Sequence, residues 1–260
     1  MSFYGVYMKF CLLGPPEVRD DACRLWFRGH RQRAVFASLA LNANRVVETD
    51  RLVDIVWGDR PPLTAQAQIQ KTLSALRQML ARTSTGGERI STVSSGYLLH
   101  ADPGEIDVEV FRGEVRQASS AMVAGDLPGA VTCFRGALAR WFGRALDGVP
   151  GLAAEATHLE EQRLIAWEEC MHAELALDGH ARVAAEIEPL IGSHPLRERL
   201  CALLMIALYG CGRRVEALRA YHGLRGRLHE ELGIEPSSEL RDIEHAILIE
   251  TPAAQMLSAP

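Results

Sequence analysis

The chain has 260 residues and a net charge of −5, and 48% of its residues are hydrophobic against 23% that are charged. This balance is typical of a core-forming protein and excludes an intrinsically disordered one. No apolar run reaches the roughly 18–20 residues of a membrane span. The first residues also lack the basic start of a signal peptide, so we expect a cytoplasmic protein without a membrane partner.

Strand-like and helical segments alternate near the N-terminus. Met8–Leu13 and Glu17–Phe27 are predicted as short strands. A helix is expected over His30–Leu41, followed by a second helix that ends at about Trp57 and has Thr49 as its N-cap.

Residues 64–82 predict an amphipathic helix with two very different faces. One stripe is apolar and is expected to be buried: Ile69, Leu73, Leu76 and Leu80. The other side is polar and contains no acidic residue: Ala67, Lys71, Ser74 and Gln78, with Gln70 and Arg77 on a flank and Arg82 at the end. Amides, hydroxyls and basic groups are the side chains that bond to base edges and phosphates.

A hairpin is predicted directly after this helix. Arg89–Val93 and Tyr97–His100 are β-prone runs around a small polar turn, Ser94-Ser95-Gly96. A polar helix followed by such a hairpin favours a DNA-binding unit. The alternative is a surface helix and a hairpin that bind no ligand.

Asp102-Pro103-Gly104 is the clearest breakpoint of the chain. Residues 1–102 carry 13 Lys and Arg against 9 Asp and Glu, whereas residues 103–260 carry 15 against 24. A basic front and an acidic back fit a nucleic-acid-binding domain joined to a domain of another kind. We therefore predict domains over 1–102 and 103–250, and a tail over 251–260.

The second half is predicted to be helical almost throughout. The expected helices cover about 107–124, 127–142, 152–178, 180–192, 196–210, 213–232 and 236–249. Glycine-containing turns at 179 and 212 are 33 residues apart, close to the tetratricopeptide period of about 34. The pattern predicts a tetratricopeptide-like domain, with an unrepeated helical bundle as the alternative.

The segment from His30 to Leu80, written HRQRAVFASLALNANRVVETDRLVDIVWGDRPPLTAQAQIQKTLSALRQML, resembles the winged-helix domain of the Streptomyces antibiotic regulatory proteins. These are activators of secondary-metabolite clusters with an OmpR-type winged helix. SSGYLLHADPGEID resembles their wing and the exit from it. AGDLPGAVTCFRGAL and the run from HPLRERL to ELGIEPSSEL resemble their bacterial transcriptional activation domain.

The resemblance implies a fold, partners and site residues. It implies a mainly helical fold with a small β part: an antiparallel sheet, a three-helix core, a wing and a tetratricopeptide-like second domain. It implies promoter DNA bound at direct repeats by two copies, and RNA polymerase as a partner. The expected protein is associated with the nucleoid and needs no cofactor.

Site residues follow from the helix pattern and the resemblance together. Phosphate contacts are expected from Arg31, Arg33, Lys71, Arg77 and Arg82. Base contacts are expected from Gln66, Gln70, Lys71, Ser74 and Gln78, and wing contacts from Ser95, Gly96 and Tyr97. The loop at 58–63 corresponds to the one that faces polymerase, which makes Asp59 and Arg60 candidates there. Lys71, Thr72 and Ala75 depart from the family's pattern and leave the operator sequence open.

Enzyme motifs are missing from the sequence: no phosphate-binding glycine loop and no H-E-x-x-H occurs. The six cysteines have no C-x-x-C spacing, so we expect free thiols and no metal. Glu160-Glu161 and Glu168-Glu169 are expected on solvated helix faces, and the four tryptophans as core anchors: Trp26, Trp57, Trp141 and Trp167. An interaction adaptor or a ligand-sensing regulator with secondary DNA contact is the alternative function, although no residue set points to a ligand.

Overall fold

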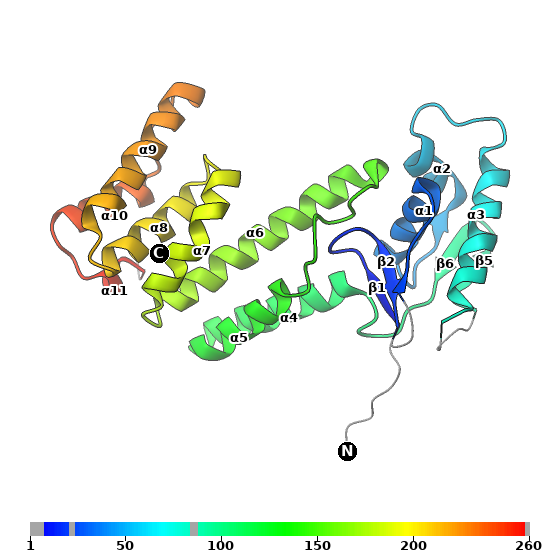
Figure 1. Ribbon diagram of the computed structural model, residues 1–260, viewed down its shortest axis with the longest axis horizontal. Coiled ribbons are helices and arrows are strands. Elements are labelled where there is room, and N and C mark those ends of the chain that lie inside the picture. Colours follow the sequence, from blue (N-terminus) through cyan, green and yellow to red (C-terminus); the bar gives the residue numbers. More distant parts are fainter. Residues whose placement is uncertain (1–7, 21–23, 84–87, 258–260) are drawn as a thin grey trace, which may run out of the picture. The chain divides into compact units, whose positions relative to one another are not determined.

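Two small antiparallel sheets and three helices form the N-terminal part of the computed structural model, which describes residues 8–20, 24–83 and 88–257 (Figure 1). The first sheet has the order β1 (Lys9–Cys11), β2 (Glu17–Arg19), β3 (Arg24–Leu25). The second has the order β4 (Val47–Glu48), β6 (Gly96–Leu99), β5 (Ile90–Val93). β5 and β6 form the predicted hairpin, with Val93 paired to Gly96 beside its turn.

The single strand predicted over Glu17–Phe27 is wrong, because the chain forms β2 and β3, which pair with each other. Val18 lies opposite Leu25, and Arg19 opposite Arg24. A β-prone composition predicts an extended conformation but does not show where the chain turns back to form a second strand. Residues 21–23 lie outside the described part.

Three helices pack against one another beside these sheets: α1 (His30–Leu41), α2 (Thr49–Trp57) and α3 (Ala65–Leu80) (Figure 1). α1 has the predicted bounds, and it buries every residue from Ala34 to Ala40. Thr49 is not the N-cap of α2. Glu48 holds that position, because β4 stays extended through Glu48 and the chain enters the helix at Thr49 without a side-chain cap.

The remaining elements are helical. They are α4 (Asp107–Val123), α5 (Leu127–Leu138), the 3-10 turn η1 (Pro150–Leu152), α6 (Ala153–Leu175), α7 (His180–Ser193), α8 (Glu198–Gly210), α9 (Arg214–Leu232), α10 (Ser238–Leu248) and α11 (Ala253–Met256). The mainly helical fold with a small β part is therefore confirmed. No helix of the described residues is long and apolar enough to cross a membrane.

Two compact units divide the chain. Unit 1 consists of Met1–Val115 and Gly136–Arg163, and unit 2 of Arg116–Arg135 and Leu164–Pro260. These units are spatial and cut through α4, α5 and α6. The domain boundary at 102–103 stays a prediction.

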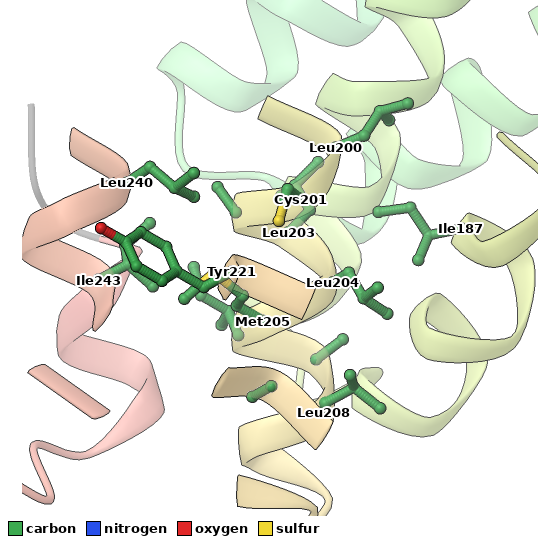
Figure 2. Packing of buried hydrophobic residues seen from close by; sticks show 14 of the residues in the cluster. Ile187, Leu200, Cys201, Leu203, Leu204, Met205, Leu208, Tyr221, Leu240 and Ile243 are labelled. Carbon is green, nitrogen blue, oxygen red and sulfur yellow. The ribbon is translucent and has the colours of Figure 1, made fainter. Parts of the chain in front are cut away.

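The core of unit 2 is built around α8, which buries every residue from Leu200 to Leu208 (Figure 2). Ile187 of α7 approaches it from one side, and Tyr221 of α9 lies next to Leu240 and Ile243 of α10 (Figure 2). Met256 of α11 is also buried in this cluster. The segment predicted as a tail thus packs in part on the core.

Several turns between the helices of unit 2 place one residue in the left-handed region. Gly125 and Gly212 supply it, with φ of 76° and 75°. In the turn after α6 the left-handed residue is Asp178, with φ of 60°, whereas Gly179 begins the next helix as its N-cap. Aspartate tolerates this conformation better than most residues with a side chain.

Candidate nucleic-acid interface

α3 separates an apolar face from a polar one, as its sequence predicts. Ile69, Leu73, Leu76 and Leu80 are completely buried, together with Ala65 at the start of the helix. The opposite face is exposed and carries the outer row, which we define as Gln66, Gln70, Lys71, Ser74 and Gln78. The structure therefore brings all five predicted base-contacting residues to one surface.

The side chains of the outer row are available to a ligand. Within the described residues, the side chains of Gln66, Gln70, Lys71 and Gln78 make no hydrogen bond or ion pair. Ser74 donates its hydroxyl to the carbonyl oxygen of Gln70 at 3.0 Å, which leaves the oxygen free to accept. The row offers amide donors and acceptors, one ammonium group and no carboxylate.

Arg77 makes contacts within the protein that the sequence did not predict. Its Nε donates to the carbonyl oxygen of Ile90, and one Nη donates to the Thr92 hydroxyl, both at 2.8 Å. The guanidinium thus connects the β5–β6 hairpin to α3, and Arg77 is partly buried. Its phosphate contact stays a prediction, with two of its donors already engaged.

Gly96 and Tyr97 lie in β6 and are buried, and Tyr97 is only 7% exposed. Gly96 pairs with Val93 on one side and Glu48 on the other. A Cβ at Gly96 would lie 2.1 Å from the carbonyl oxygen of Val47. Both residues therefore shape the hairpin, whereas Thr92 of β5 and the tip at Ser94 and Ser95 are exposed.

Arg31 and Arg33 of α1 lie in different surroundings. Arg31 is exposed, donates to Gln68 of α3 and lies 5.6 Å from the ring centre of Trp57. Arg33 instead places its guanidinium against Gly148, where an added Cβ would lie 2.2 Å from its Nη. The structure brings Arg31 to α3 but not Arg33.

A basic flank beside α3 was missed from the sequence in part, because Arg82 was its one member predicted as a contact residue. We define it as Arg24, Trp26, Arg28 and Arg82. Trp26, Arg28 and Arg82 line a surface cavity of about 370 Å³ together with Gln78 of the outer row. Trp26 is 56% exposed, so its prediction as a core anchor is wrong. The Arg24 guanidinium lies 4.1 Å from its ring centre, and this cation–π contact favours exposure of the indole.

The density of basic residues over 24–33 is the signal that could have revealed this flank, since arginine or histidine occupies half of those ten positions. A second cavity, of about 530 Å³, continues along α3 between Lys71 and the start of α1. Guanidinium groups and an exposed indole are suited to a sugar–phosphate backbone.

The loop between α2 and α3 is exposed from Gly58 to Arg60. Asp59 and Arg60 make no ion pair or hydrogen bond within the described residues. Leu63, two residues before the start of α3, is fully exposed and was not predicted as a contact residue. No group of three His, Cys, Asp or Glu side chains in the described part of the chain could hold a metal ion.

Two family models match the chain. Residues 28–99 match "Transcriptional regulatory protein, C terminal", and residues 106–248 match "Bacterial transcriptional activator domain". The first range contains α1, α2, α3 and the hairpin, and therefore the whole outer row.

Related proteins cover nearly all of the chain. DnrI of Streptomyces peucetius is 35% identical over 254 residues, which are 94% of this chain and 93% of DnrI. AfsR of Streptomyces griseus is 36% identical, but the chain spans only 24% of its length. A solved structure titled "Mycobacterium tuberculosis EmbR in complex with low affinity phosphopeptide" superposes with a TM-score of 0.90 at 31% identity, covering 98% of this chain and 70% of that one.

Family models together cover most of the chain, and DnrI matches it over nearly its full length. RedD of Streptomyces coelicolor extends the agreement, with 34% identity over 98% of this chain and 75% of RedD. The chain therefore belongs to the Streptomyces antibiotic regulatory protein family of transcriptional regulators, with an OmpR-type DNA-binding domain and a bacterial transcriptional activator domain.

Proposed function

We propose that the protein activates transcription of a secondary-metabolite cluster by binding direct repeats near a promoter and recruiting RNA polymerase. The observation that carries this proposal is the outer row of α3, an exposed and acid-free set in which only Ser74 has a hydrogen-bond partner among the described residues. The antibiotic regulators among its relatives support the target class. No catalytic step and no cofactor is part of this function.

Within this proposal, the outer row reads bases in the major groove. Gln66, Gln70 and Gln78 can each give and accept a hydrogen bond at a base edge, as an adenine requires. Lys71 and Arg82 hold phosphates, as do Arg31 and the basic flank. Ser95 at the hairpin tip approaches the backbone, while Arg77 keeps the hairpin in place.

The base-reading role is tested by first mapping the protected promoter region with the full chain. Gln70→Ala is then measured by fluorescence anisotropy on single-base variants of that site. We expect a loss of about 1–3 kcal/mol of discrimination at particular base pairs. A uniform loss over all variants would place Gln70 among the phosphate contacts. Equal affinity of the wild type for promoter and random duplex would refute the whole proposal.

Two copies are expected to bind the repeated sites side by side. A single winged helix reads few base pairs, so a pair of repeats supplies the missing specificity. Deleting one repeat should reduce the affinity of the protein for the remaining repeat. Band-shift experiments can measure this, because they resolve DNA with one bound protein from DNA with two. Equal occupancy of a single repeat and of the pair would contradict this stoichiometry.

The polymerase contact is proposed for the α2–α3 loop, with Leu63 added to Asp59 and Arg60. An exposed leucine beside two free charged groups is suited to protein contact rather than to DNA. Leu63→Ser should reduce transcription from the target promoter in a purified system while leaving promoter affinity unchanged. Loss of promoter affinity in the same variant would assign the loop to DNA binding instead.

A further inference from the structure

Unit 1 contains a cavity of about 560 Å³ that the proposed function does not use. Its walls come from α1, the segment leading into β4, α2, α4 and the start of α6. This volume lies within the range of about 300–1,000 Å³ that small-molecule sites occupy. The cavity is separate from the outer row, since none of those five residues lines it.

A buried hydroxyl marks the inner wall of this cavity. Ser38 of α1 lines it and is only 1% exposed. Its Oγ makes no hydrogen bond to any described residue. A buried polar group without a partner is destabilising, and such groups are normally satisfied by water or a ligand.

An arginine without an acidic partner lies on another wall. Arg112 of α4 is half-buried, and its Nε donates to the Gln162 side-chain oxygen at 3.1 Å. Gln162 Nε2 is itself 2.9 Å from Nε2 of His158, and this contact holds the amide that orients the guanidinium. Among the described residues Arg112 forms no ion pair. Its remaining donors are therefore free for an anion.

The other charged groups on the walls are already balanced or lie at the rim. Arg51 and Glu155 pair with each other at 3.0 Å. Glu48 is exposed at the start of α2. Apolar side chains complete the lining, with Ile55 and Leu159 buried and Val46 46% exposed. An exposed valine at a cavity is a surface that a ligand would cover.

We propose that this cavity binds a small carboxylic acid with an apolar body, whose carboxylate is held by Arg112 and by the Ser38 hydroxyl. A guanidinium holds a carboxylate through charge-assisted hydrogen bonds, and the hydroxyl supplies a further donor. The apolar body lies against Ile55, Leu159 and Val46. Because the walls include α1 and α2 of the DNA-binding domain, the ligand stabilises the fold that carries α3.

The test uses the full chain and two probes of equal shape, 1-naphthylacetate and its uncharged amide, with binding followed by calorimetry and thermal unfolding. We expect saturable binding of the acid and at least about tenfold weaker binding of the amide. Arg112→Gln should weaken binding of the acid by about tenfold and should abolish the preference over the amide.

Three further variants separate this site from binding elsewhere. Val46→Trp should block the cavity. Ser38→Ala should weaken binding of the acid while leaving the fold intact. Arg116→Gln is the matched control, because Arg116 is exposed on the same helix as Arg112 and does not line the cavity. Folding of each variant is checked by far-UV circular dichroism.

The proposal is overturned by any of three results. These are no saturable binding of the acid up to about 1 mM, equal binding of acid and amide, or binding of the acid that both Arg112→Gln and Val46→Trp leave unchanged. The measurement needs no DNA, so its failure is distinguishable from failure of the proposed promoter binding.

Discussion

Gly96 lies where the wing hairpin passes close to the main chain of β4. Its hydrogen atom faces the Val47 carbonyl, where a Cβ would lie at 2.1 Å. Main-chain atoms of β4 cannot move aside as a flexible side chain would. The glycine is thus required by space, since its φ is not in the left-handed region.

Gly96→Ala is therefore expected to lower the free energy of unfolding of unit 1 by about 1–3 kcal/mol, as for other overpacked sites. Gly136→Ala is the matched control, because Gly136 lies in α5 with nothing within 4 Å of its added Cβ. The control should be neutral or stabilising by about 0.5–1 kcal/mol. Denaturant unfolding measures both, and equal stability of the two variants would contradict the close approach.

Asp107 gives unit 1 a pH-dependent contact. Its carboxylate accepts from the main-chain N–H groups of Leu12 and Leu13 at 2.8–3.0 Å. Burial raises the pKa of Asp107 from 3.8 to about 6, although the N–H donors of Leu13, Leu12 and Val108 oppose the rise. A carboxyl with a raised pKa binds more protons in the folded than in the unfolded chain.

Asp107 should therefore make unfolding free energy decrease as pH rises from about 3.8 to about 6, and have no further pH effect above that window. The slope from this one group is at most about 1.4 kcal/mol per pH unit. Comparing Asp107→Asn with the wild type across this range isolates the effect. A stability difference that does not change with pH would show that the carboxyl keeps its ordinary pKa.

Single-residue roles were harder to predict than residue types. Trp141 is buried as expected, with its ring edge-on to Phe111, while Trp26 is exposed beneath Arg24. Composition could not distinguish the two, because the difference depends on what packs over each ring, and Arg24 lies over Trp26 from two positions earlier in the chain. Glu168 shows the reverse error, since it is completely buried and paired with Arg197 at 2.8 Å instead of lying in solvent.

At the scale of elements, the hydrogen bonds of Arg77 connect α3 to the β5–β6 hairpin. They join the α3 side chain to the main chain of β5 and to the Thr92 hydroxyl. The hairpin then keeps its place relative to the outer row before DNA arrives. Such preorganisation lowers the ordering cost of binding.

Arg77→Ala should remove this connection and loosen the hairpin. We expect faster amide hydrogen exchange over residues 88–99, a loss of about 1–2 kcal/mol of stability, and weaker DNA binding that is uniform across operator variants. Gln78→Ala, one residue further along α3 and without a partner, should leave the exchange unchanged. Unaltered hairpin exchange in Arg77→Ala would contradict this role.

Helices were predicted better than strands, for a physical reason. The apolar stripe of α3 repeats over 16 residues, so its period defines both the buried face and the outer row. β2 and β3 contain only three and two residues, which is too short for alternation to show. The contacts of Arg77 could not be predicted either, because its hydrogen bonds to Ile90 and Thr92 depend on the fold and not on the helix period.

For the whole molecule, charge determines how DNA binding responds to salt. Residues 1–102 carry an excess of four basic residues, and residues 103–260 an excess of nine acidic ones. The number of counterions released from the phosphates on binding therefore depends on the basic residues of the N-terminal half. The acidic half contributes no attraction to a duplex.

Promoter affinity should fall linearly on a plot of log K against log salt. Lys71→Gln and Arg82→Gln should each make the slope shallower by about 0.9 if each residue neutralises one phosphate. Arg241→Gln, an exposed substitution on α10, should leave the slope unchanged. A slope that none of these variants alters would remove Lys71 and Arg82 from the phosphate contacts.

The division of α3 into two independent faces has a consequence for how such regulators diversify. The buried stripe holds the helix in the core, while the side chains of Gln66, Gln70, Lys71 and Gln78 contact no other described side chain by hydrogen bond or ion pair. Under the proposed base contacts, exchanges at these positions should alter promoter choice with little penalty for folding. A duplicated copy could be retargeted to a new gene cluster by a few surface changes, while its scaffold is inherited intact.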